Sequence, residues 1–162
     1  MKNYIASLII SLFLLLPLGS QAQLLEVKQT VFGMDCAPCA YGLEKRIQKM
    51  DGIQSASVSL NKGLLTTNLK KDNQLTLKGI RKAVEESGFK AKEATITVAG
   101  KITKNDSGKY VLETKTGERF LLETENKNMQ DNILESGQRI IVTGKAETGD
   151  EETTLWVQNI KA

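Results

Sequence analysis

Between positions 24 and 91 the apolar residues switch between two spacings, and this pattern limits the possible folds more than any other feature. In the stretches 24–32, 56–60 and 65–69 apolar residues alternate with polar ones, as in half-buried strands. Two further stretches have apolar residues three or four positions apart, which predicts amphipathic helices: Ala40, Leu43, Ile47 and Met50 in the first, Leu77, Ile80 and Val84 in the second. With a short last strand from Phe89, the order is βαββαβ, which predicts an α+β fold.

Residues 94–162 carry a different pattern of short strands and turns. We expect a long strand bent at Gly100, a hairpin, a short helix containing Met129 and Ile133, and two final strands. A single helix before the last two strands favours a small closed β-barrel. The charge changes at the same place, because residues 23–93 hold 12 Lys+Arg and 8 Asp+Glu whereas residues 94–162 hold 9 and 11. We therefore predict two domains, 23–93 and 94–162.

Residues 1–22 have the layout of a secretory signal peptide. Lys2 is followed by an apolar run over residues 5–18, and the small residues Ser20 and Ala22 frame a cleavage site. An uncleaved anchor is the alternative, but the run is shorter than the roughly 20 residues of a membrane-spanning helix. We expect a periplasmic or secreted protein with no stable membrane anchor, in an oxidising compartment.

The composition excludes several kinds of site. The chain has no histidine, which removes Ser-His-Asp triads, Cys-His dyads and imidazole metal sites. Its 2 cysteines allow only one two-thiolate site or one disulfide. These exclusions favour a protein that is not an enzyme.

The two cysteines, Cys36 and Cys39, lie three positions apart between the first strand and the first helix. A helix N-terminus lowers the pKa of a nearby thiol and so favours the thiolate, which is the form that binds metal. Two thiolates without imidazole make a soft site that selects Cu(I) and similar thiophilic ions. The pattern indicates a metal site suited to transfer.

Two other interpretations of this pair remain open. A Cys-x-x-Cys at a strand–helix junction is also typical of redox dithiols. Against this, Pro38 is the only proline after residue 22, so no second proline can pack against the pair, and the only tryptophan is Trp156. The third interpretation is a structural disulfide, although so short a loop gains little stability from closure.

Residues 24–92 resemble a heavy-metal-associated (HMA) domain, the ferredoxin-like module of copper chaperones, metal ATPases and the periplasmic mercury-binding protein. The resemblance rests on Gly-Met-x-Cys-x-x-Cys at 33–39, the βαββαβ order, and Ser-Gly-Phe at 87–89. It implies that Cys36 and Cys39 are metal ligands, that Met34 is buried as packing, and that Phe89 lies near the site.

Asp35 bears on the choice of metal. A carboxylate beside the first cysteine is similar to the modules of zinc-, cadmium- and lead-exporting ATPases, where it can be a third ligand, and a hard oxygen favours Zn(II) over Cu(I). The alternative is a solvated residue favoured by the helix dipole. Cu(I) is the leading candidate, with Zn(II), Cd(II) and Hg(II) open.

Residues 94–162 resemble a small OB-type barrel. Such folds often bind nucleic acid through basic grooves and stacked aromatic rings. This half is acidic, and its aromatic residues Tyr110, Phe120 and Trp156 are expected in or near the core, so we expect no nucleic-acid partner.

A group of cationic residues in the first half has two interpretations: Lys45, Arg46, Lys49, Lys70 and Lys71. They form either a solvated surface or a surface that steers an acidic metal-transfer partner.

The sequence therefore predicts an exported protein that binds one thiophilic ion through Cys36 and Cys39 and passes it by ligand exchange to a metal-transfer or efflux protein. A Zn(II), Cd(II) or Hg(II) carrier and a thiol–disulfide oxidoreductase are the alternatives. A Cys36–Cys39 disulfide would abolish metal binding until it is reduced.

Overall fold

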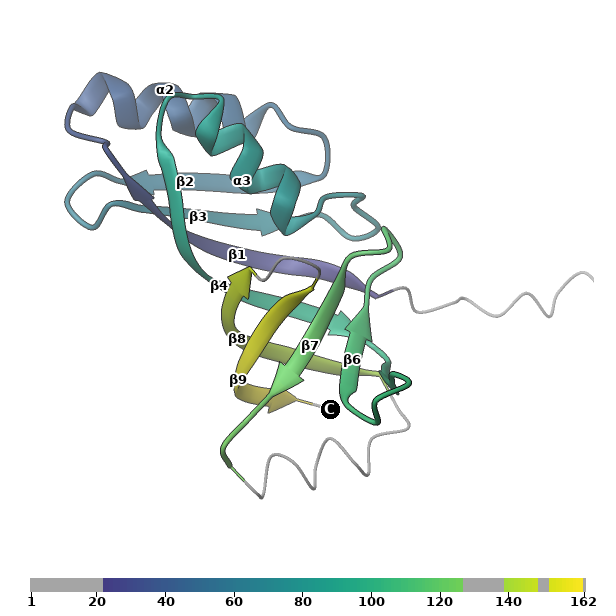
Figure 1. Ribbon diagram of the computed structural model, residues 1–162. Coiled ribbons are helices and arrows are strands. Elements are labelled where there is room, and N and C mark those ends of the chain that lie inside the picture. The colour runs from purple at the N-terminus through teal and green to yellow at the C-terminus, as the bar shows by residue number, and fades with distance from the viewer. Residues whose placement is uncertain (1–21, 127–138, 149–151, 162) are drawn as a thin grey trace, which may run out of the picture.

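The computed structural model describes residues 22–126, 139–148 and 152–161 (Figure 1). Of the predicted signal peptide, residues 1–21 lie outside this range, as does the helix expected around Met129 and Ile133. The first elements are β1 (Gln23–Phe32), α2 (Ala37–Gln48), β2 (Ile53–Ser59), β3 (Leu64–Leu69), α3 (Leu77–Glu85) and β4 (Lys90–Gly100). The later strands are β5 (Ile102–Lys104), β6 (Tyr110–Glu113), β7 (Arg119–Glu123), β8 (Ile140–Thr148) and β9 (Thr153–Lys161).

The first six elements have the predicted βαββαβ order. Their strands lie in the order β2-β3-β1-β4, all antiparallel, and α2 and α3 cover one face of this part of the sheet (Figure 1). This is a ferredoxin-like arrangement. Within the described ranges, no helix has the length and apolar character that crossing a membrane requires.

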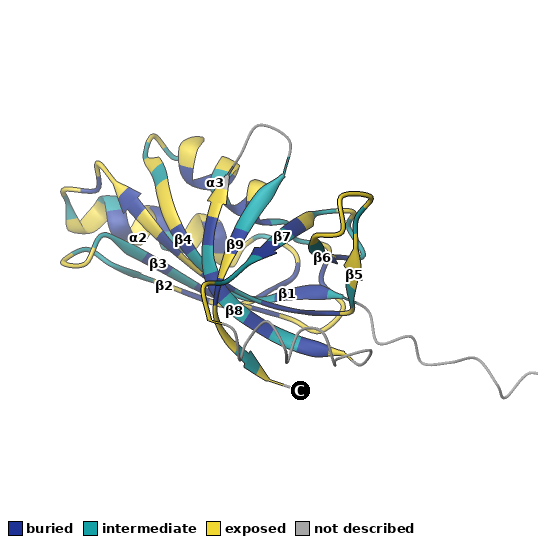
Figure 2. Cartoon of the chain, turned by 60° about the horizontal axis from the view of Figure 1, so that its bottom comes forward, coloured by how far each residue is buried: buried dark blue, intermediate teal, exposed yellow. Residues whose placement is uncertain are grey.

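The core between the sheet and the helices is built by the apolar residues that alternate along the strands and recur every three or four positions along the helices. Buried and exposed positions alternate along the strands (Figure 2), and Val27, Leu65 and Ile96 are 0% exposed. The apolar residues of α2 and α3 pack against these strand residues, and Ile47 and Ile80 are also 0% exposed. Burying an aliphatic side chain of this kind stabilises the fold by about 1.5–3 kcal/mol.

β4 is shared by both halves of the chain. It pairs with β1 from Gln23↔Ala99 to Phe32↔Lys90, and its other edge pairs with β8 from Ala94↔Ala146 to Gly100↔Ile140. The short strand expected from Phe89 and the long strand expected in the second half are thus one strand. The expected boundary between 93 and 94 lies inside it. From Ala94 onward no position of β4 is exposed, because both edges of the strand are occupied there.

The closed barrel expected for residues 94–162 is not shown by the strand pairing. Within the described residues, nine strands form one open sheet in the order β2-β3-β1-β4-β8-β9-β7-β6-β5. In this order β2 and β5 are the two end strands, because β4 pairs with β1 and β8 and β5 pairs with β6. The expected bend lies at the β4–β5 junction, where a Cβ on Gly100 would come within 3.0 Å of the Leu112 side chain.

The turn between β6 and β7 contacts the first half of the chain. The Glu118 carboxylate accepts hydrogen bonds from the backbone N–H groups of Leu77 (2.9 Å) and Lys78 (3.2 Å), at the N-terminus of α3. Thr76 Oγ1 accepts from the next free donor, Gly79 N–H, at 2.9 Å. Burial raises the pKa of Glu118, opposed by these backbone hydrogen bonds and by the charge of Arg81. The first turn of α3 is thus capped from a hairpin 41 residues away.

The outer edge of β2 is covered by side chains of α2. Glu44 Oε2 accepts the backbone N–H of Val58 at 3.0 Å, and Gln48 Nε2 donates to the carbonyl oxygen of Ala56 at 3.0 Å. These contacts satisfy backbone groups that another strand could otherwise bind, so this end of the sheet is protected against edge-to-edge association.

Candidate metal centre

The loop from the end of β1 to the start of α2 positions the two cysteines. Gly33 has φ +88°, which a residue with a side chain rarely adopts, and it turns the chain out of β1. Met34 then folds inward and is 6% exposed, as the resemblance implied. Its burial fixes the loop against the core.

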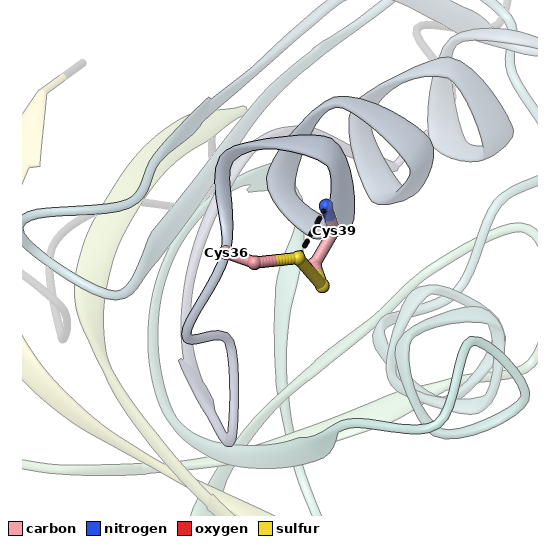
Figure 3. The surroundings of a disulfide bond; sticks show 2 residues. All are labelled: Cys36 and Cys39. Carbon is pink, nitrogen blue, oxygen red and sulfur yellow. Dashed lines mark hydrogen bonds between the residues drawn. A yellow bond between two sulfur atoms is a disulfide. The ribbon is translucent and has the colours of Figure 1, made fainter.

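Cys36 is the N-cap residue of α2. Its backbone is extended, and its Sγ accepts the backbone N–H of Cys39 at 3.1 Å (Figure 3). Pro38 lies in the first helical turn, where a missing N–H leaves no intrahelical bond unmade. The sulfur thus takes the place that a serine or aspartate oxygen has in most helix caps.

Cys36 and Cys39 are joined by a disulfide (Figure 3), with an Sγ–Sγ distance of 2.02 Å and a Cα–Cα distance of 5.1 Å. The structure therefore brings both sequence-predicted ligands together, in their oxidised form. Both residues are only partly buried. Because the thiolate is the metal ligand, this form must gain two electrons before it can hold a metal ion through both sulfurs.

Asp35 is exposed beside the pair. Among the described residues, there is no group of three or more Cys, Asp or Glu side chains that could hold a metal ion. The donors gathered at the loop are thus the two sulfur atoms. Phe89 is partly buried and packs, like Cys39, against the hydrophobic core.

The cationic residues singled out in the sequence are exposed, but not all are free. Arg46 forms an ion pair with Glu86, and Lys45 Nζ donates to Gln48 Oε1 at 3.1 Å and lies 5.3 Å from the Tyr41 ring centre. Phe32 was not singled out in the sequence, although a phenylalanine directly before the Gly-Met-x-Cys-x-x-Cys motif is a feature that could have drawn attention to it; in the structure it is exposed at the end of β1.

Comparison with known proteins gives the family. The model of the heavy-metal-associated domain matches residues 29–90. The periplasmic component of a mercuric transport protein from Shewanella putrefaciens is 31% identical over 81 residues, which is 50% of this chain and 88% of that protein. Copper chaperone CopZ of Staphylococcus saprophyticus is 31% identical over 62 residues, covering 38% of this chain and 90% of the chaperone.

Two further similarities are more limited. Human copper-transporting ATPase 2 is 36% identical over 61 residues, which is 38% of this chain but only 4% of the ATPase. A solved CopZ metallochaperone covers 41% of this chain and 98% of its own, with 24% identity and a TM-score of 0.39. Since the similarity to the mercuric transport and copper chaperone proteins extends over nearly their whole length, the chain belongs to the heavy-metal-associated domain family.

Proposed function

We propose that this protein is an exported carrier of one thiophilic metal ion, with Cu(I) as the leading candidate, held by the thiolates of Cys36 and Cys39. The observation that carries the proposal is the placement of two partly buried cysteines at the N-terminus of α2, in a chain of this family. Relatives named as copper chaperones and as a mercuric transport component support a soft metal.

Transfer follows from the small number of ligands. Two thiolates leave a Cu(I) ion open to a third sulfur, so a thiolate of a partner can add before a thiolate of this chain leaves. The ion is then never released to water. The partial exposure of both cysteines gives the incoming thiolate access. The partner is a metal-transfer or efflux protein with a soft site of its own.

A second candidate function is favoured by the disulfide itself. Because Cys36 and Cys39 can form a disulfide with each other, they can act as the redox pair of a thiol–disulfide oxidoreductase. In that reaction a partner dithiol transfers two electrons and two protons, leaving the partner as a disulfide and Cys36 and Cys39 as thiols. The same reaction would prepare the protein to bind metal.

Export and an OB-like second half complete the proposal. Export rests on the layout of residues 1–22 and on the periplasmic location in the name of the mercuric transport relative. An OB-like arrangement is supported by the parallel pairing of β7 with β9 and by the single residue, Lys101, between β4 and β5. Through that residue one bent strand would pair with β8 at one end and with β6 at the other.

An anaerobic titration tests the proposal. The reduced chain from Gln23 onward competes for Cu(I), and separately for Zn(II), with a chelator of known affinity, and a Cys36→Ser/Cys39→Ser variant is the control. We expect tight Cu(I) binding that the control lacks. Strong Zn(II) binding that falls in Asp35→Ala would identify a divalent-metal carrier instead. If neither metal binds more tightly than to the control, and the chain reduces insulin disulfides, the oxidoreductase alternative replaces the proposal.

A further inference from the structure

One surface beside the metal loop combines an exposed aromatic ring with cationic side chains. Phe32, the last residue of β1, is 63% exposed and immediately precedes the loop. It pairs directly with Lys90 of β4, and Lys92 Nζ lies 5.8 Å from the centre of its ring. We call Phe32, Lys90 and Lys92 the strand-end patch.

The lysines of the strand-end patch are not neutralised within the described part of the chain. No ion pair there includes Lys90 or Lys92. The nearest carboxylate in sequence, Glu93, pairs with Lys145 at 3.0 Å instead. The patch therefore presents two uncompensated positive charges around an apolar ring.

This end of β4 has no described strand paired to its outer edge. β8 pairs with β4 only from Ala94 onward, so residues 90–93 have no pairing partner on that edge. The β6–β7 turn contacts α3 at the N-terminus of that helix, whereas the end of β1 that leads into α2 points away from β6 and β7 (Figure 1). Phe32 lies only four residues before Cys36 in the chain, so a partner that covers the loop can also contact the strand-end patch.

We infer that the strand-end patch is the docking surface for the metal-transfer partner, and that the partner presents carboxylates and an apolar side chain around its own thiolate site. The inference rests on the proposed function. The charge of the patch selects a partner with acidic residues and speeds encounter, because complementary charges raise association rates. The Phe32 ring adds apolar contact that lengthens the life of the complex. This differs from steering by the lysines of α2 and β3, which the sequence suggested.

A transfer assay with designed acceptors tests the inference. The reduced chain is loaded with one Cu(I) and mixed with fluorescent Cys-x-x-Cys peptides that carry a leucine and are flanked either by glutamates or by glutamines. At low ionic strength we expect transfer to the glutamate peptide to be about 5-fold faster. Lys90→Gln/Lys92→Gln should lose most of this preference. Lys70→Gln/Lys71→Gln, which removes the same charge after β3, should retain it.

The apolar part is tested with the glutamate peptide. Phe32→Thr should slow transfer about 3-fold, whereas Trp156→Thr, which removes an exposed ring of β9, should not. Chelator competition should give one Cu(I) affinity for all variants. A wild-type chain that binds Cu(I) but shows no charge preference, or equal losses in the two lysine variants, overturns the docking surface alone. A wild-type chain that binds no Cu(I) overturns Cu(I) carriage and, with it, a docking surface for Cu(I) transfer.

Discussion

Replacing Glu118 with alanine should destabilise the first half of the chain, although Glu118 belongs to the β6–β7 turn. The substitution removes the acceptor of two backbone N–H groups in the first turn of α3, those of Leu77 and Lys78. Losing a helix cap costs about 1 kcal/mol, and each of these donors would have to find water instead.

The size of the effect is reduced by the burial of the carboxylate. Burial removes water from the charged carboxylate of Glu118 and so raises its pKa, and this desolvation cost disappears in the variant. Two hydrogen bonds to a charged acceptor, less this cost, give an expected loss of about 1–2 kcal/mol in the free energy of unfolding.

Urea denaturation of reduced wild type and Glu118→Ala measures the loss, with Glu113→Ala as control because Glu113 is exposed on the same hairpin. Amide hydrogen exchange should accelerate at Leu77 and Lys78 in Glu118→Ala alone. If the free energy changes by less than about 0.3 kcal/mol and exchange at both amides is unchanged, the hairpin does not cap α3, and the reasoning fails.

Three further outcomes are expected. The folded-state pKa of Glu118 is raised, so the folded chain holds this proton more tightly; stability should fall as pH rises from about 4.5 through the raised value, and Glu118→Gln should remove this slope in urea titrations across pH. Gly144→Ala would place a Cβ 2.3 Å from a backbone carbonyl oxygen of β9 and should cost about 2 kcal/mol in urea denaturation, whereas Gly42→Ala, with nothing within 4 Å, should not destabilise. Glu44→Ala/Gln48→Ala uncovers the edge of β2 and should produce dimers or larger species in analytical ultracentrifugation; a monomer at all concentrations would contradict the protective role.

Local patterns predicted the local elements well. The apolar spacing at Leu77, Ile80 and Val84 predicted α3, and all three residues are buried. The cysteine pair was also found from a local pattern, because the strand before it and the helix after it can be predicted from the neighbouring residues. The structure shows the pair oxidised, a state that is compatible with all three interpretations of the spacing: a metal site, a redox dithiol and a structural disulfide.

Pairing between strands that are far apart in the sequence could not be predicted from local patterns. The alternation at 96–98 has the same form whether the strand pairs on one edge or on both, so the continuity of β4 with the preceding short strand was missed. Nothing near Glu118 in the sequence indicates that its carboxylate caps a helix 41 residues earlier. The open sheet was missed for the same reason, since closure depends on which strands meet and not on how many there are.

The shared strand β4 also limits how this chain can be recombined. A crossover placed between 93 and 94, where the charge changes sign, would separate β1 from most of its partners in β4 and would uncover Val27. An intact copy of the metal-binding half must carry its neighbour's first strand as far as Ala99, the partner of Gln23. Substitutions along β4 must therefore satisfy the packing of both halves at once.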